Sequence, residues 1–179
     1  VEEYAEFVPH GLKPDAIKDL YAGKLVMTGG SHGDKVMYAM GAEFVEVRAL
    51  TREIRVPRIV GAFAAGRLMN TRTVHSQLMG GMIWGIGSAL HEATEIDRRY
   101  ARYVNDNLAD YRVPVNADVQ QVDVILVPEV DHDVNPPGVK GLGELANVVT
   151  AAAIANAIYH ATGRRIRELP VRIENLLTA

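Results

Sequence analysis

The chain has 179 residues, of which 48% are hydrophobic, and its 19 Lys and Arg against 22 Asp and Glu give a formal net charge of -3. This length and apolar content suit one ordinary domain, or two small lobes with a shared core. The slightly acidic balance offers no basic surface for nucleic acid or anionic lipid. The chain contains no cysteine, which excludes disulfides, thiolate nucleophiles and Cys-ligated metal centres within it.

The first 35 residues are rich in turn-forming residues and show little periodicity, apart from one short helix expected near residues 14–22. The chain starts with "VEEYAEF", without an initiator Met, a basic leader or a cleavage site. We therefore expect a piece of a longer protein, made of an irregular N-terminal segment (1–35) and one domain (36–179). The sequence does not indicate a compartment, cytoplasmic or periplasmic.

A β-hairpin is expected next, because β-branched and aromatic residues dominate residues 36–50 and 54–64 on either side of "TRE". A long helix follows, beginning after Asn70 or Thr71 as N-cap and losing its apolar pattern after His91. Its longest apolar run has 13 residues (78–90), whereas a membrane-spanning helix needs about 20. The run is therefore interpreted as buried, and no membrane association is expected.

The second half begins with a short segment near residues 99–104 and an alternating strand at 120–128. A loop stiffened by two prolines and then loosened by glycines leads into a helix from Glu144 to about residue 161, closed by Gly163. A last strand is expected at 166–173. The order of these elements predicts a two-layer α+β fold with a mixed sheet.

Glu144 is the sharpest candidate for chemistry, because it stands alone at the start of a helix behind a glycine-rich loop. The helix dipole and the free N–H groups stabilise an anion there, and the glycines let a bulky ligand approach. Simple N-terminal capping is the alternative interpretation, because acids are common at helix starts. Lys140, four residues earlier, could contact a phosphate or oxyanion, or be an ordinary solvated lysine.

Gln77 precedes Gly80 and Gly81 on the first long helix. Its amide can offer two donors and an acceptor beside bare backbone, which suits a flat heterocycle. An ordinary polar residue near a helix start is the alternative. The four glycines of this helix each cost about 1 kcal/mol of helix propensity, so something is expected to approach that face closely.

Three other motifs are set aside. "HEATE" at His91 lacks the second histidine that a zinc-protease helix needs four residues later. "GGMIWGIG" resembles a dinucleotide-binding fingerprint, but it lies inside a helical pattern and not directly after a strand. The neighbours Asp131, His132 and Asp133 cannot all point to one cation, so a hydrated turn is the better interpretation.

Two stretches, "GAFAAGRLMNTRTVHSQLMGGMIWGIGSALHE" and "GVKGLGELANVVTAAAIANAIYHATGRRIRELP", resemble the C-terminal part of the molybdopterin-binding subunit of the xanthine dehydrogenase and aldehyde oxidoreductase family. The resemblance extends over roughly residues 36–177, and the second stretch is similar to the family's active-site segment. It is greatest for the bacterial aldehyde oxidoreductase branch. This implies a molybdenum cofactor-binding domain, with molybdopterin cytosine dinucleotide as the cofactor.

Residue by residue, the resemblance implies that Glu144 is the active-site base and that Gln77, with Gly80 and Gly81 beside it, binds the pterin. It also implies that Lys140, Gly141 and Gly143 form the loop that brings the glutamate under the metal. No side chain ligates molybdenum in the family, so no protein metal ligand is expected. The implied reaction is water-derived hydroxylation of an aldehyde or N-heterocycle.

The implied partners are the rest of the molybdopterin subunit and two further subunits, one with iron–sulfur clusters and one with FAD. The 179 residues alone are expected to be inactive, and Met, Leu and Trp84 of the glycine-rich helix to be covered by the rest of the subunit. The chain departs from the family at Asn70-Thr71, where Asn-Pro is common. Two alternatives remain: a noncatalytic cofactor-binding or interaction domain of the same fold, and an unrelated α+β domain in which Glu144 only caps a helix.

Overall fold

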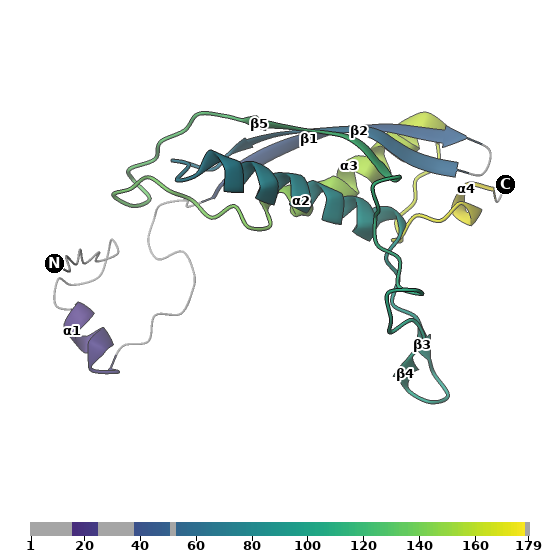
Figure 1. Ribbon diagram of the computed structural model, residues 1–179, viewed down its shortest axis with the longest axis horizontal. Helices are drawn as coiled ribbons and strands as arrows, with labels where there is room; N and C mark the ends of the chain where they lie inside the picture. The colour runs from purple at the N-terminus through teal and green to yellow at the C-terminus, as the bar shows by residue number, and fades with distance from the viewer. Residues whose placement is uncertain (1–15, 25–37, 51–52, 178–179) are drawn as a thin grey trace.

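The protein is described by a computed structural model for residues 16–24, 38–50 and 53–177. One layer is a three-stranded sheet of β1 (Met40–Leu50), β2 (Glu53–Ala64) and β5 (Val119–Leu126). The other layer is formed by α2 (Thr71–Leu90) and α3 (Leu145–Thr162), which cover one face of the sheet (Figure 1). The predicted two-layer α+β fold is confirmed.

The sheet is mixed, with strand order β1-β2-β5. β1 and β2 form the expected antiparallel hairpin, with Glu43 opposite Gly61. β5 returns parallel to β2 because α2 lies between the two strands in the chain, as a parallel crossover requires. The hairpin turn at 51–52 and most of the N-terminal segment lie outside the described residues, except α1 (Ala16–Tyr21). The division at residue 35 therefore stays a prediction.

Both long helices begin and end where the sequence predicts. Asn70 caps α2, accepting hydrogen bonds from the backbone N–H groups of Arg72 (3.0 Å) and Thr73 (3.2 Å). α3 starts after Glu144 and ends at Gly163, whose φ of 73° is the left-handed conformation that glycine adopts at helix ends. The departure from Asn-Pro at position 70 thus leaves the helix start intact.

The glycines of α2 let α3 approach closely. A Cβ at Gly81 would lie 3.0 Å from the Cβ of Ala146, and one at Gly85 would lie 2.8 Å from the hydroxyl and methyl of Thr150. The core lies between this helix pair and the sheet, and Leu78 and Met82 are fully buried in it. The close approach expected from the glycine content is therefore made, in large part, by the chain's own second helix.

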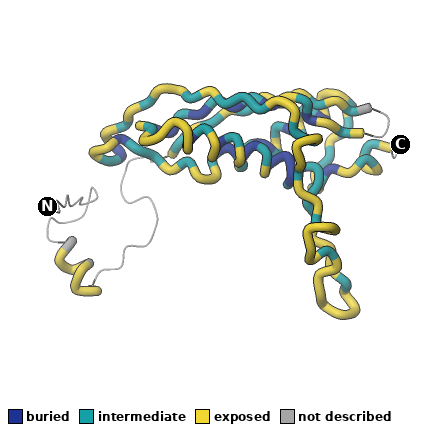
Figure 2. Tube along the Cα trace, in the orientation of Figure 1, coloured by how far each residue is buried: buried dark blue, intermediate teal, exposed yellow. Residues whose placement is uncertain are grey.

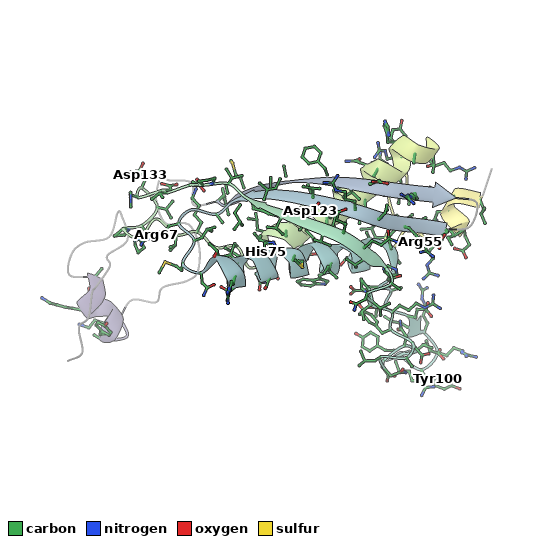
Figure 3. All side chains as sticks on the ribbon, turned by 45° about the horizontal axis from the view of Figure 1, so that its top comes forward. Arg55, Arg67, His75, Tyr100, Asp123 and Asp133 are labelled. Atoms are coloured by element: carbon green, nitrogen blue, oxygen red, sulfur yellow. The ribbon has the colours of Figure 1, made fainter. Side chains whose placement is uncertain are left out.

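Residues 91–118 form an arm that leaves the two-layer body, with β3 (Ile96–Asp97) paired to β4 (Arg102–Tyr103) near its end. Figure 2 shows the arm mostly exposed and without buried residues, in contrast to the body. Tyr100 lies at its tip, far from the sheet (Figure 3). The short predicted segment at 99–104 is thus half of a small hairpin.

The predicted last strand at 166–173 is wrong. These residues are irregular and lead into α4 (Glu174–Leu177). Pro170 has no N–H to donate to a sheet. A backbone hydrogen bond from Val171 N–H to the carbonyl of Ala89 (2.7 Å) ties the segment to the body. Alternating Ile, Leu and Val instead place Val171 and Ile166 against the core.

The apolar side chains of α2 are only partly available to another part of a larger protein. Leu78 and Met82 are buried within this chain, whereas Trp84 is 48% exposed. A second open apolar surface lies on the sheet face away from the helices, where Met40, Phe44 and Ile125 are more than half exposed. Within the described residues, none of the helices is long and apolar enough to cross a membrane.

Candidate functional site

The start of α2 and the start of α3 meet at the predicted site. The side-chain amide of Gln77, in the second turn of α2, donates a hydrogen bond to the carbonyl oxygen of Gly143 (2.6 Å). Gly143 immediately precedes Glu144. The two elements that the sequence singles out independently are therefore joined by a direct contact, and Gln77 keeps one amide N–H and its oxygen for other partners.

Glu144 is the N-cap residue of α3, and its side chain is exposed. A capping side chain accepts a hydrogen bond from the first-turn N–H groups, but Glu144 makes no such bond. Its backbone carbonyl alone takes part, accepting from Val148 N–H (3.3 Å). Capping by the carboxylate therefore does not account for an acid at this position.

Glycine leaves space around Glu144 and Gln77. A Cβ at Gly80, Gly141 or Gly143 would meet no protein atom within 4 Å. Gly81 differs, because its missing side chain makes room for Ala146 of α3. The surface beside Gln77 is thus bare backbone at Gly80, while Gly81 brings the two helices together.

Lys140 is neither solvated nor free to meet an anionic ligand. Its side chain is 6% exposed, and its ammonium lies 2.5 Å from Glu129 Oε1 and 3.1 Å from Asp131 Oδ2. Hydrogen bonding to Lys140 lowers the pKa of both carboxyls, and the bond to Glu129 raises the pKa of Lys140. Lys140 therefore anchors the loop that carries Gly141, Gly143 and Glu144.

The loop held by Lys140 is also hydrogen-bonded to the residues that follow β2. Glu129 accepts a second hydrogen bond from Gly66 N–H (2.9 Å), and Arg67 N–H donates to the carbonyl of Gly138 (2.7 Å). Figure 3 places Arg67 and Asp133 at this end of the sheet, opposite Arg55. Gly66 and Gly138 have φ of 66° and 72°, which explains their identity by backbone conformation.

Sequence reasoning missed Glu129 and Gly66. A carboxylate at the end of β5 and a glycine after β2 carry no motif, and only their proximity to Lys140 shows what they do. Gly138 is likewise fixed by its surroundings, because a Cβ there would meet Val130 and the backbone of Asp131.

Other candidate sites lie elsewhere or are not formed. Asp131 faces Lys140, while His132 Nδ1 lies 3.0 Å from the carbonyl of Pro136, so these neighbours diverge as expected. The described residues contain no cluster of three or more His, Asp or Glu suited to a metal ion. A cavity of about 640 Å³ lies near His91 at the far end of α2, lined by neither Glu144 nor Gln77.

Comparison with known proteins identifies the family to which this chain belongs. The sequence model of the molybdopterin cofactor-binding domain matches residues 18–120, more than half of the chain. The aldehyde oxidoreductase molybdenum-binding subunit PaoC of Escherichia coli K12 is 43% identical over 136 residues, 75% of this chain and 19% of that protein. The putative xanthine dehydrogenase molybdenum-binding subunit XdhA of the same strain is 35% identical over 140 residues, 77% and 18% of the two chains.

Solved structures agree with these relatives. The aldehyde oxidoreductase of Desulfovibrio desulfuricans ATCC 27774 matches with a TM-score of 0.61 and 30% identity, over 71% of this chain and 14% of that one. A Cu,Mo-CO dehydrogenase matches with a TM-score of 0.69 over 77% of this chain and 18% of that one, but at 18% identity it supports the fold alone. Fold and sequence thus define a molybdenum-cofactor domain. The chain belongs to the molybdopterin cofactor-binding domain family of the molybdenum hydroxylases, and it spans about a fifth of the length of these two curated relatives.

Proposed function

We propose that this chain supplies the catalytic base and part of the pterin site of a molybdenum hydroxylase that oxidises an aldehyde or an N-heterocycle. The observation that carries the proposal is the hydrogen bond between Gln77 and Gly143. Next to it, the exposed Glu144 side chain makes no capping bond and lies beside open glycine backbone. The curated relatives named as aldehyde oxidoreductase and xanthine dehydrogenase subunits support the substrate class.

Glu144 is suited to accept a proton. The N-terminus of α3 favours an anion at this point, and the carboxylate is not occupied by a capping bond. Its oxygens are therefore available to take the proton of the water-derived nucleophile during hydroxylation. A well-placed general base contributes about 10²- to 10⁴-fold to the rate.

The described residues fit a pterin cofactor. The free N–H and the oxygen of the Gln77 amide can pair with a heterocycle edge, and side chains are missing at Gly80, Gly141 and Gly143, where they would obstruct it. When bound, the molybdenum cofactor supplies the two-electron redox chemistry. The ion pairs of Lys140 fix the loop that leads to Glu144, so in this proposal the chain contributes orientation and proton transfer.

The dinucleotide form and the other subunits follow from the family. We propose molybdopterin cytosine dinucleotide as the cofactor, and partner subunits carrying iron–sulfur clusters and FAD. A relative named as the gamma subunit of the 6-hydroxypseudooxynicotine dehydrogenase complex of Paenarthrobacter nicotinovorans supports assembly with partners. It is 32% identical over 126 residues, 69% of this chain and 16% of that protein.

Replacing Gln77 tests the cofactor site. In the full-length enzyme, Gln77→Leu keeps the helix but removes both the bond to Gly143 and the groups offered to the pterin. Molybdenum and pterin content per subunit should fall several-fold. Gln120→Leu, at an exposed position of β5, is the matched control and should keep the parent content. Full occupancy in the Gln77 variant would refute this part of the proposal.

A further inference from the structure

A partly buried carboxyl group, that of Glu43, lies between the sheet and α3. Glu43 lies on β1 and points to the helix-covered face, while its neighbour Phe44 points outward and is 71% exposed. Opposite Glu43 in the hairpin is Gly61, which has no side chain. The carboxyl therefore meets α3, where Thr150 is completely buried.

The hydrogen bonds at this point favour a proton on Glu43. Thr150 Oγ1 lies 2.6 Å from Glu43 Oε2 and 2.8 Å from the carbonyl oxygen of Ala146. A hydroxyl has one proton and a carbonyl only accepts, so an ionised Glu43 and Ala146 compete for it. A protonated Glu43 donates to Thr150, which in turn donates to Ala146, and both contacts are satisfied.

The remaining carboxyl oxygen supports the same protonation state. Glu43 Oε1 is buried and has no hydrogen-bond partner. A neutral carbonyl oxygen in that position costs far less than a carboxylate oxygen withdrawn from water. The burial raises the pKa of Glu43 to about 7, against the lowering effect of the Thr150 hydrogen bond.

No described cation faces Glu43 to offset a negative charge. On α3 the only ionisable side chains are the exposed Tyr159 and His160, about ten residues beyond Thr150. On the sheet, the inward neighbours of Glu43 on β1 are Gly41 and Val45, and β2 presents Gly61. On α2, the residue against Thr150 is Gly85.

We propose that Glu43 is a positioning residue that acts as a neutral acid, donating to Thr150 and thereby holding the first turns of α3, with Glu144 at their start, against the sheet. Thr150 is six residues from Glu144, about 9 Å along the helix, and Ala146 lies in the first turn between them. The role assigned to Glu144 rests on the proposed function, whereas the hydrogen-bonded link does not.

The link predicts how α3 responds to pH. Folding raises the pKa of this acid above its value in the opened state. The stabilisation of the folded helix is complete at pH values below the pKa of the opened state, and it is lost as pH rises through the pKa of the folded state. For Glu43 the window runs from 4.5 to about 7. The first turns of α3 should open more readily at pH 8.5 than at pH 5.5.

Hydrogen exchange of the full-length protein measures this opening. Protection of the peptide 144–152, corrected for intrinsic exchange rates, should fall about thirtyfold between pH 5.5 and 8.5, from the two pKa values. In Glu43→Gln the amide donates to Thr150 at every pH, so the corrected profile should be flat. Glu46→Gln is the matched control, because Glu46 is on the same strand with its side chain 53% exposed, and should behave as the parent.

A parent profile as flat as that of Glu43→Gln overturns the proposal. A second measurement requires no variant: the side-chain carboxyl carbon of Glu43 in labelled protein should titrate near neutral pH by NMR, and titration at the ordinary 4.5 refutes it. Neither readout uses cofactor or turnover. If hydrogen exchange showed the predicted pH dependence but the Glu144→Gln enzyme were fully active, only the proposed function would be refuted.

Discussion

Gly85 offers a direct test of the helix packing that positions the site. In Gly85→Ala the new Cβ would lie 2.8 Å from the hydroxyl and methyl of Thr150 and closer still to its Cβ. Carbon atoms pack best at about 3.5–4.0 Å, so the two helices must separate by roughly 1 Å or Thr150 must move. Thr150 is fully buried and bonded to Glu43, which leaves it little freedom.

The expected magnitude combines two opposing effects. Alanine is better than glycine in a helix by about 1 kcal/mol, while overpacking a well-packed core costs about 1–3 kcal/mol. At Gly85 the net effect should be a loss of about 1 kcal/mol in the free energy of unfolding. At Gly80, where a Cβ meets nothing within 4 Å, only the gain of up to about 1 kcal/mol remains.

Urea denaturation of the two cofactor-free variants, followed by far-UV circular dichroism, compares them on one helix. The midpoint should fall for Gly85→Ala and rise for Gly80→Ala, with unchanged slopes. If the two variants were equally stable, the close packing of α2 on α3 at Thr150 would be wrong.

Two other perturbations test the loop anchor and the helix start. Lys140→Met leaves Glu129 and Asp131 without their cation, so their lowered pKa values should rise. A carboxyl whose pKa is lowered by folding stabilises the fold at pH values above its ordinary pKa, and this stabilisation is lost on acidification. The parent should therefore lose more stability than the variant as pH falls below about 4. If the stability of both proteins changed with pH in the same way, the anchor would be excluded. Asn70→Ala should cost about 1 kcal/mol in urea denaturation through loss of the N-cap bonds, while Asn70→Asp should cost little, and an unchanged alanine variant would contradict the cap.

Helix periodicity and capping residues predicted the fold well, since both long helices carry their own start and stop signals in Asn70 and Gly163. The last strand failed because alternation of Ile, Leu and Val at 166–173 fits a strand and an irregular segment packed on a core equally well. Pro170 was the available signal against it.

The site was predicted in part. Gln77 and Glu144 could be singled out from the sequence because of their glycine neighbours, and the structure brings them to adjacent positions. The surroundings of Lys140 could not be predicted, because its partners Glu129 and Asp131 lie eleven and nine residues earlier and belong to no motif. Glu43 was missed because a strand with Glu and Phe in succession gives no sign that Glu points inward.

Glu144→Gln in the complete, cofactor-loaded enzyme tests the central claim most directly. Glutamine keeps the size of the side chain and one acceptor but cannot take a proton at neutral pH. Glu174→Gln, at the exposed start of α4, is the matched control. The account predicts that the rate of the reductive half-reaction falls about 10²- to 10⁴-fold in Glu144→Gln alone, while molybdenum content and melting temperature stay at parent values. A Glu144→Gln enzyme that turned over within about tenfold of the parent would contradict the role of Glu144 as the base.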